Sequence, residues 1–279
     1  MSGPPEDPRA WRSWDVYALE VRLVDRLRAR TPWTWVLVTL CVGVAVVGSA
    51  YEAGLAAKEG LSIPASLSLV FGMKENALIE GGQWWRLLTS AFLHAGWMHL
   101  AFNALALVYV GGLVERLVGR WPWWVLFVTS ALGGAVSSWQ WTEAPAVGAS
   151  GAVFGYLGAL LVYGFVHRRT LPAALARRLT WGLLPWVVLN LAFGLWPGVR
   201  IDNAAHVGGM VVGALLALAL PDPWGRRVSP WWRWAGWALG VLVLVAVGAW
   251  LWEVARCGSS LDAINRCYGD VLGALEAGE

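Results

Sequence analysis

The stretch GASGAVFGYLGALLVYGFV, residues 148 to 166, places Ser150 among glycines at the head of an apolar run. A helix needs about 20 mostly apolar residues to cross the hydrocarbon core of a membrane, and this run is close to that length. A hydroxyl group adds nothing to burial in lipid, so the serine needs another explanation. The stretch therefore predicts a membrane-spanning helix that carries a candidate reactive group near its first turn.

The composition of the 279 residues is typical of a membrane protein. Hydrophobic residues make up 58% of the chain and charged residues 14%, far from the balance of soluble proteins. The 22 tryptophans fit the same class, because indole rings settle at the membrane–water interface. We therefore expect an all-α polytopic membrane protein.

Seven stretches are long and apolar enough to be interpreted as spans. They lie at roughly 33–50, 97–114, 121–139, 147–166, 179–196, 203–220 and 234–252. This divides the chain into an N-terminal segment of residues 1–32, a membrane domain of residues 33–252 and a tail of residues 253–279. The polar segment before the first stretch is longer than the n-region of a signal peptide, so we expect that stretch to be a retained span.

The distribution of basic residues predicts the orientation. In the seven-span arrangement, 15 of the 21 Lys and Arg residues fall on the side of the N-terminal segment and six on the other side. The N-terminus is therefore expected in the cytoplasm and the tail on the exoplasmic side. The basic residues form short clusters between apolar runs, which argues against nucleic-acid binding. Only two of them are Lys, which suggests a GC-rich bacterial source and hence a bacterial cytoplasmic membrane.

The segments outside the spans carry weaker signals. Trp11, Trp14, Tyr17, Val21 and Val24 predict an amphipathic helix, which either lies on the cytoplasmic leaflet or packs on the protein. The 46 residues between the first two spans are too apolar for a free loop, and we expect them to fold back onto the outer leaflet.

The three cysteines fit the same arrangement. Cys257 and Cys267 lie in the predicted exoplasmic tail, where they are either joined by a disulfide or present as two free thiols. Cys41, in the first span, is interpreted as a packing residue.

Polar side chains of reactive type gather at one depth of this arrangement. His99 and Asn103 fall in the outer third of the second span, and Ser150 and His206 fall within the first turns of the fourth and sixth spans. Ionisable groups inside a membrane are costly and are functional by default. These four residues are therefore the candidate site. Asn190 in the fifth span and His94 just before the second are the other notable polar residues.

Glycine spacing favours contact between the spans that carry Ser150 and His206. Gly148, Gly151, Gly155 and Gly158 are spaced 3, 4 and 3 residues apart, and His206, Gly209 and Gly213 are spaced 3 and 4 apart. Small residues at this spacing let helix backbones approach closely. If the two stripes face each other, a serine side chain can reach an imidazole across the gap, although such stripes also serve ordinary helix packing.

A serine beside a histidine points to acyl transfer. Serine becomes a good nucleophile when a neighbouring base takes its proton, and the pKa of histidine suits that task. The side chains of Asn103 and His99 and the backbone N–H of Ser150 are the available donors for an oxyanion. Asp202 is better explained as an N-cap of the sixth span than as the third member of a triad. No HExxH pattern or pair of acids within spans is present in the sequence, and no metal or cofactor is expected.

These residues bring a family into view. HAGWMHLAFN at 94–103, GASG at 148–151 and AHVGG at 205–209, in this order and on separate spans, resemble the rhomboid family of intramembrane serine proteases. WWR at 84–86 is similar to the tryptophan-arginine motif in that family's first loop, and Glu115 falls where the family often has a glutamate. The resemblance covers about residues 30–252. It implies a six-helix rhomboid-like bundle, with the seventh span as an appended C-terminal helix.

Carried over to this chain, the resemblance implies that Ser150 is the nucleophile and His206 the general base of a dyad. The residues of the oxyanion hole would be His99, Asn103, Ser150 and Gly148. Phe154 would pack against the catalytic imidazole and His94 would steady the first loop. The remaining supporting residues would be Gly151, Gly209, Trp85, Arg86 and Glu115.

The resemblance further implies hydrolysis of a peptide bond in or near the transmembrane helix of another protein, close to the exoplasmic face. The partners would be single-span membrane proteins and the lipid bilayer, and the glycines leave open whether two copies of the chain pair. Two alternatives remain. One is a non-catalytic relative that binds membrane helices as a chaperone or adaptor, although such relatives usually lack Ser or His. The other is a transporter, for which inverted repeats would be expected and are not seen.

Overall fold

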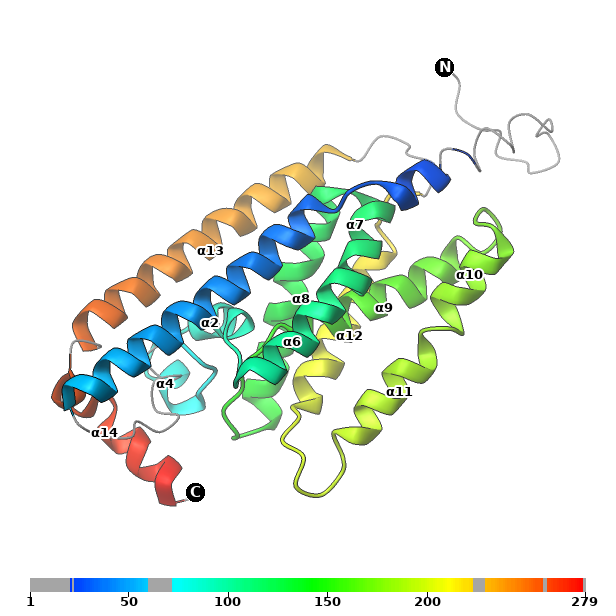
Figure 1. The fold of residues 1–279 in the computed structure, drawn as a ribbon. Coiled ribbons are helices and arrows are strands. Elements are labelled where there is room, and N and C mark those ends of the chain that lie inside the picture. Colours follow the sequence, from blue (N-terminus) through cyan, green and yellow to red (C-terminus); the bar gives the residue numbers. More distant parts are fainter. Residues whose placement is uncertain (1–20, 22, 60–71, 223–228, 258–259, 278–279) are drawn as a thin grey trace.

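A computed structural model of the chain describes residues 21, 23–59, 72–222, 229–257 and 260–277. All regular elements of these residues are helical, and their only β-type pairing is an isolated antiparallel bridge between Lys74 and Ala146. Figure 1 shows a bundle of helices joined by loops that lie mostly at its two ends. The amphipathic helix expected around Trp11–Val24 falls mostly outside the described residues.

The helices follow one another in an order that matches the apolar stretches. They are α2 (Pro32–Glu59), α4 (Asn76–Glu80), α5 (Arg86–Thr89), the 3-10 helix η2 (Ser90–Phe92), α6 (Trp97–Ala106), the π-helix η3 (Leu107–Gly111), α7 (Gly112–Val118), α8 (Arg120–Trp141), α9 (Ser150–Val166), α10 (Ala173–Thr180), α11 (Leu184–Phe193), α12 (Asn203–Ala217), α13 (Pro230–Cys257) and α14 (Leu261–Ala277).

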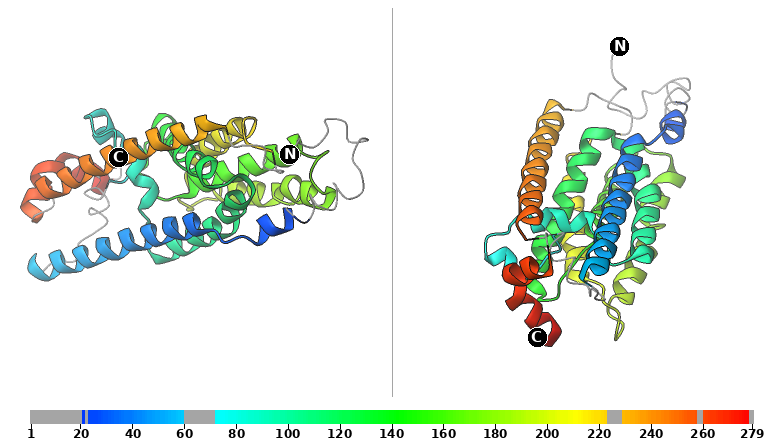
Figure 2. Two further views of the ribbon diagram at one scale, coloured as in Figure 1. Left: turned by 90° about the horizontal axis from the view of Figure 1, so that it is seen from above. Right: turned by 60° about the vertical axis from the view of Figure 1, so that its left-hand side comes forward.

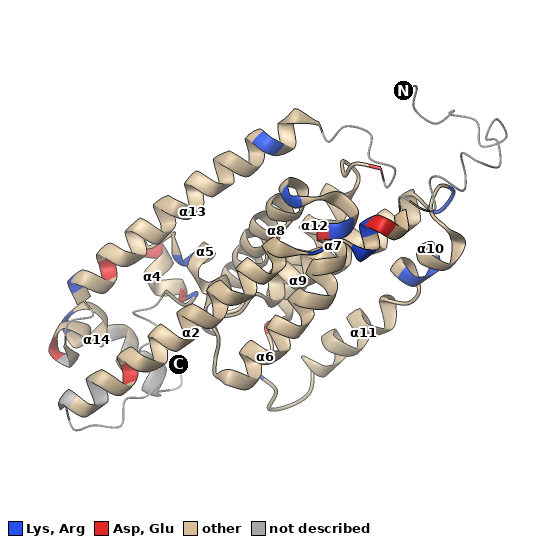
Figure 3. Cartoon of the chain, turned by 45° about the horizontal axis from the view of Figure 1, so that its top comes forward, with Lys and Arg blue, Asp and Glu red and all other residues tan. Residues whose placement is uncertain are grey.

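The chain is a multi-pass membrane protein. Three helical segments among the described residues are long and apolar enough to span a bilayer by themselves, namely Leu23–Gly54, Trp97–Val118 and Pro230–Cys257. Figure 3 shows the charged residues gathered toward the two ends of the bundle, with long uncharged stretches of helix between them. This distribution is what a hydrocarbon core requires, because charges are costly at its centre.

Helix α9 is the centre of the bundle. Twelve of its 17 residues are buried, including the whole run from Gly151 to Leu160, and it packs most closely against α12 and α8. A Cβ atom at Gly209 would overlap the carbonyl oxygen of Gly151, and one at Gly213 would overlap that of Gly155. The two predicted glycine stripes therefore face each other, as expected, and bring the backbones of α9 and α12 into direct contact.

The fifth expected span, over 179–196, is wrong as a single helix. The structure has two helices there, α10 and the ten-residue α11, separated by a turn at residues 181–183. Pro185 explains the break: it lies in the first turn of α11 and has no backbone N–H to continue a preceding helix. In Figure 1, α10 and α11 lie at the edge of the bundle.

The second expected span is a continuous helical segment with a wide turn inside it. Helices α6 and α7 are joined by the π-helix η3, which carries i→i+5 geometry within a mainly α-helical run. His99 and Asn103 lie before this turn on α6, and Glu115 lies after it on α7. The turn therefore sets how the two ends of the segment are rotated relative to each other.

Helices α2 and α13 are longer than the sequence suggested, and they run in the same direction at opposite edges of the molecule in the left view of Figure 2. The start of α2 is held by Glu115 of α7. The carboxylate of Glu115 accepts hydrogen bonds from the backbone N–H groups of Trp33 and Thr34, at 3.2 and 2.8 Å, and from Thr34 Oγ1 at 2.7 Å. A carboxylate at a helix N-terminus accepts hydrogen bonds from the unpaired N–H groups there, and its negative charge interacts favourably with the helix dipole.

Candidate active site

Ser150 and His206 meet where α9 and α12 begin. Ser150 is the first residue of α9, and its Oγ lies 2.9 Å from Nε2 of His206, which is one turn into α12. The imidazole is buried, and the ring of Phe154 stacks on it with a centroid separation of 4.1 Å and an interplanar angle of 7°. Phe154 is four residues after Ser150 and so lies on the same face of α9. The stacked ring fixes the plane of the imidazole against the serine hydroxyl.

Asp202 is the N-cap of α12, as predicted. One of its carboxylate oxygens accepts the backbone N–H of Ala205 at 2.9 Å, and the other accepts a hydrogen bond from Ser138 of α8. Nδ1 of His206 is buried and makes no hydrogen bond. The imidazole therefore has a serine at one nitrogen and no carboxylate at the other, which is the arrangement of a pair and not of a triad. The contact of Ser138 with Asp202 could not be predicted from the sequence.

His99 and Asn103 lie beside the backbone that leads into Ser150. Gly148 has a φ of +122°, and a Cβ there would lie 2.8 Å from Cε1 of His99 and 3.7 Å from Nδ2 of Asn103. Only glycine combines this backbone conformation with so close an approach. Gly148 is therefore the point at which α6 contacts the segment before the serine.

Two side-chain N–H groups face this backbone. Nδ1 of His99 accepts the backbone N–H of Ala95 at 3.2 Å, so the proton of a neutral ring is on Nε2. Asn103 uses one amide N–H on the carbonyl of His99, at 3.0 Å, and has a second N–H available. The backbone N–H groups of the first turn of α9 are not needed within the helix. Together these groups can surround a developing negative charge near Ser150.

His94 contacts the site through His99. The two rings meet edge to face with a centroid separation of 5.4 Å, and neither nitrogen of His94 makes a hydrogen bond. Burial, with a smaller contribution from His99, lowers the pKa of His94 to about 4, so its ring is neutral at physiological pH. Asn190, in contrast, bonds the carbonyl of Trp186 on the exposed side of α11 and takes no part in this cluster.

Trp85 and Arg86 hold the first loop, defined as residues 60–96, of which 72–96 are described. The buried guanidinium of Arg86 donates from Nε to Gln83 Oε1 at 2.6 Å and from Nη1 to the carbonyl of Met73 at 3.1 Å. It also lies 4.6 Å from the ring centroid of Trp85. The side chain thus ties the start of the described loop to α5.

Lys74 is a residue that the sequence reasoning missed. It holds residues 142–149, here called the serine loop, which connect α8 to Ser150. Its Nζ donates to the carbonyls of Thr142 and Ala144 at 2.7 and 3.1 Å, and its backbone exchanges two hydrogen bonds with Ala146. The signal was faint: Lys74 is one of only two lysines in an arginine-rich chain. Burial lowers the pKa of Lys74, which the nearby carboxylates of Asp202, Glu75 and Glu143 oppose.

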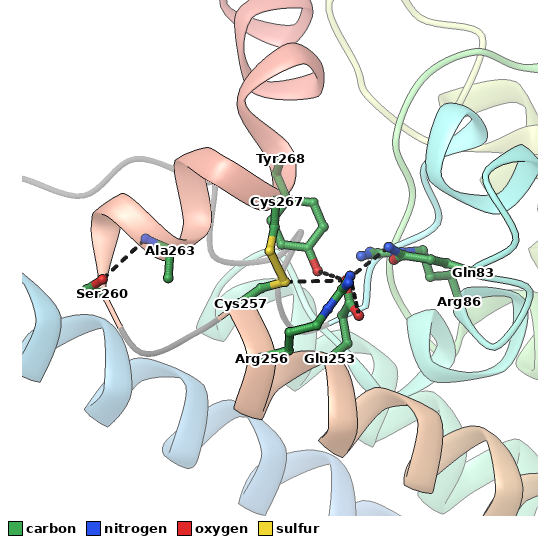
Figure 4. Close-up of a disulfide and its surroundings, with 9 residues drawn as sticks. All are labelled: Gln83, Arg86, Glu253, Arg256, Cys257, Ser260, Ala263, Cys267 and Tyr268. Carbon is green, nitrogen blue, oxygen red and sulfur yellow. Dashed lines mark hydrogen bonds and ion pairs between the residues drawn. A yellow bond between two sulfur atoms is a disulfide. The ribbon is translucent and has the colours of Figure 1, made fainter.

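The tail carries a disulfide, which decides between the two alternatives that the sequence left open. Cys257 at the end of α13 is bonded to Cys267 of α14 (Figure 4). Cys41 is a buried free thiol in α2. Within the described part of the chain, no three His, Cys, Asp or Glu side chains gather as ligands of a metal would.

Known proteins resemble the region that contains this site. A family model described as the rhomboid domain matches residues 81–222. Rhomboid protease GluP of Bacillus subtilis (strain 168) is 41% identical over 164 residues, which are 57% of this chain and 31% of that protein. Rhomboid protease AarA of Providencia stuartii is 35% identical over 173 residues, 54% of this chain and 61% of that protein.

A plant relative extends the similarity. RHOMBOID-like protein 4 of Arabidopsis thaliana is 37% identical over 160 residues, 56% of this chain and 40% of that protein. The chain thus spans between 31% and 61% of the length of these three relatives. The family model covers half of the chain and includes α6 to α12, with Ser150 and His206 among them. On this basis, the chain belongs to the rhomboid family.

Proposed function

We propose that the chain is an intramembrane serine endopeptidase that uses Ser150 as nucleophile and His206 as general base. The observation that carries the proposal is the 2.9 Å contact between Ser150 Oγ and His206 Nε2, with the imidazole plane held by Phe154. Membership of the rhomboid family and similarity to two proteins named rhomboid proteases support the same activity.

In the first half of the reaction, Ser150 Oγ attacks the carbonyl carbon of the scissile bond while His206 Nε2 takes its proton. The resulting oxyanion is stabilised by the N–H groups of His99, Asn103 and the Ser150 backbone, beside Gly148. Each such preorganised donor contributes roughly 10²- to 10³-fold in rate. His206 then protonates the leaving amine, and the C–N bond breaks to give an acyl-enzyme.

In the second half, water attacks the ester of the acyl-enzyme. His206 takes a proton from that water, and the tetrahedral intermediate collapses with return of a proton to Ser150 Oγ. The products are a carboxylate and a regenerated serine. Because Nδ1 of His206 has no carboxylate partner, the positive charge on the ring is compensated mainly by the oxyanion beside it.

The substrates are proposed to be single-span membrane proteins, cut in or near the transmembrane helix. A peptide bond inside a helix has to be unwound before Ser150 can reach its carbonyl, which favours helix-weakening sequences. Residues 33–252 would form the proteolytic membrane domain. The excess of basic residues at the other end of the bundle supports a site that opens on the exoplasmic side of a bacterial cytoplasmic membrane, with a cytoplasmic N-terminus.

The test is cleavage of a model single-span substrate in liposomes by wild type, Ser150→Ala and His206→Ala. A matched control is Ser130→Ala, which removes a buried hydroxyl of α8 that makes no hydrogen bond. We expect wild type and the control to release product and to react with a fluorophosphonate probe. The two site variants should lose activity by ~10⁴-fold or more.

Cleavage by Ser150→Ala at the wild-type rate would eliminate Ser150 as the nucleophile. Failure of all four proteins to cleave several substrates, together with no labelling by the probe, would favour a non-catalytic rhomboid that binds membrane helices as a chaperone or adaptor.

A further inference from the structure

Glu253 is a buried carboxylate that joins three separate segments. Its Oε1 accepts hydrogen bonds from Gln83 Nε2 of the first loop at 3.1 Å, from the Tyr268 hydroxyl of α14 at 3.0 Å and from Arg256 Nη2 at 3.0 Å. Figure 4 shows these donors converging on it. A negative charge near the C-terminal end of α13 interacts unfavourably with the helix dipole. The hydrogen bonds from these donors therefore have to compensate the unfavourable position of the Glu253 carboxylate.

The disulfide keeps one of these donors in place. Cys257 and Cys267 join α13 to α14, and Tyr268 directly follows the second cysteine. Burial is the main cause that raises the pKa of the Tyr268 phenol, so the group stays protonated and donates to the carboxylate. Without the disulfide, α14 would be held by the covalent chain, its packing and the hydrogen bond from Tyr268 to Glu253.

The tail also packs directly on the first loop. Buried residues from both segments form what is here called the tail cluster, which consists of Met73, Leu78, Cys257, Ile264 and Tyr268. Val147 of the serine loop packs against this cluster, three residues before Ser150. One apolar contact surface thus extends from α14 to the segment that leads into the nucleophile.

Hydrogen bonds provide a second connection over the same path. Gln83 Oε1 accepts a hydrogen bond from Arg86 Nε. Arg86 Nη1 donates in turn to the carbonyl of Met73, the residue before Lys74. Lys74 in turn holds the serine loop through two carbonyls and its pairing with Ala146. Each link is a contact of at most 3.1 Å, so a shift of the tail is transmitted to the serine loop with little slack.

We propose that Glu253 is a positioning residue that, together with the disulfide-linked tail, holds the first loop and the serine loop so that Ser150 meets its substrate in a reactive geometry. Proteolysis by this chain accordingly depends on an oxidised Cys257–Cys267 pair. The inference rests on the proposed protease activity only for its kinetic readout. A displacement of about 1 Å at a reacting group can cost up to ~10²-fold in rate, and a loss of about 10-fold is expected for a displacement passed on through two loops.

The first comparison uses Glu253→Gln and a matched control, Asp262→Asn, which neutralises an exposed acid of α14. Glu253→Gln should lower kcat about 10-fold and leave KM within twofold, because the substrate-binding surface is untouched and the nucleophile is misplaced. The rate of Ser150 labelling by a fluorophosphonate should fall in parallel. Asp262→Asn should match wild type in all three quantities.

The second comparison uses reduction. Dithiothreitol supplies two electrons and two protons, which convert the disulfide into two thiols while the reagent becomes a cyclic disulfide. Reduced wild type should lose activity about 10-fold and recover it on reoxidation. A Cys257→Ser/Cys267→Ser variant should be equally impaired and should not respond to the reagent. Cys41 is the remaining cysteine and is the same in both proteins.

Amide hydrogen exchange separates this proposal from the proposed function. Exchange of residues 142–149 should become faster on reduction or in Glu253→Gln, while exchange in α9 and α12 stays at the wild-type rate. If wild type neither cleaves nor labels, the protease proposal fails, yet the exchange data still decide whether the tail holds the serine loop. Unchanged exchange of that loop, or kcat within twofold of wild type after reduction, would overturn the positioning role. Should Glu253→Gln fail to fold, the reversible reduction of wild type decides alone.

Discussion

Helices α9 and α11 are both strongly apolar, yet they are used in opposite ways. On α9, all residues from Gly151 to Leu160 are buried, and its glycines let other backbones approach directly. On α11, Val187 is buried, whereas Trp186, Leu189 and Phe193 are 66%, 64% and 58% exposed. Apolar character alone does not distinguish the two helices, because an apolar side chain is stable both in lipid and in a protein core. The glycines do: those of α9 let α12 approach so closely that the large side chains beside them are buried too, whereas α11 contains no glycine.

For the site, the consequence is that α9 and α12 are held rigidly while α11 is not. Ser150 and His206 lie on the tightly packed side, where a small displacement meets backbone atoms at once. Helix α11 is attached by few contacts, such as the bond from Asn203 Nδ2 to the carbonyl of Leu191 at 3.0 Å. The following substitutions test this division, beginning with the largest expected effect.

Gly209→Leu should disrupt the close packing of α12 against α9. Its side chain would overlap the carbonyl of Gly151 and push α12 away from α9, which separates His206 from Ser150. We expect a loss of about 3 kcal/mol in the free energy of unfolding and of at least ~10³-fold in kcat/KM. Gly240→Leu on α13, where a Cβ meets nothing within 4 Å, is the control. Equal activity of the two variants would mean that the glycine contact does not set the site geometry.

Asn103→Ala removes one donor from the tight side without changing the packing of helices. We expect kcat to fall ~10²- to 10³-fold with KM nearly unchanged, because the amide acts on charge that develops only in the transition state. The control is Asn190→Ala on α11, whose amide bonds only its own helix. A rise in KM with kcat preserved would instead assign Asn103 to substrate binding.

Glu115→Gln weakens the anchoring of α2 and leaves the site intact. The amide keeps one acceptor oxygen, but its NH2 group replaces the other, so either Trp33 or Thr34 loses its acceptor, and the charge that interacts favourably with the helix dipole is lost. We expect the free energy of unfolding to fall by about 1 kcal/mol, measured by denaturation in detergent, with kcat unchanged. Glu80→Gln, on an exposed acid of α4, should show no change. A drop in kcat would connect α2 to catalysis.

Trp186→Ala should have the smallest effect on stability, within about 0.5 kcal/mol, because its side chain faces the surroundings of the bundle. The same substitution at Trp123, which is 2% exposed and donates to the carbonyl of Gly111, should cost about 3–5 kcal/mol. Unfolding measurements on the pair report the difference directly. Similar losses would show that α11 is packed as firmly as α8.

Much of the fold could be predicted, because the physical requirement is local. A membrane span has to be apolar over a set length, so six of the seven stretches fall mainly on one helical segment each, and the fifth, at 179–196, is interrupted by a turn. Polar side chains stand out against such a background, which is why Ser150, His206, His99 and Asn103 could be grouped before any coordinates. The glycine spacing left open whether the two stripes face each other or serve ordinary helix packing, and the structure decides for the first.

The parts that could not be predicted depend on contacts between distant residues. Lys74 donates to carbonyls about 70 residues away in the sequence. Glu253 accepts a hydrogen bond from Gln83, which is 170 residues away. Neither leaves a pattern in its neighbouring sequence. The disulfide stayed open for the same reason, since it depends on how α14 returns toward α13. The break before α11 did have a local signal, Pro185, which the apolar character of the stretch concealed.

The π-helix between α6 and α7 has a consequence for the lengths that this segment tolerates. Each residue of an α-helix advances the chain by about 100° around the axis, and a π turn accommodates one residue more than an α turn. Removing one residue from Leu107–Gly111 would therefore leave an α-helical turn with nearly the same rotation, so that Glu115 stays at the start of α2 and Asn103 stays beside Gly148. Removing one residue from the α-helical part between Gly112 and Glu115 would instead rotate Glu115 by about 100° away from α2, so the effect of a deletion in this segment depends on which turn loses the residue.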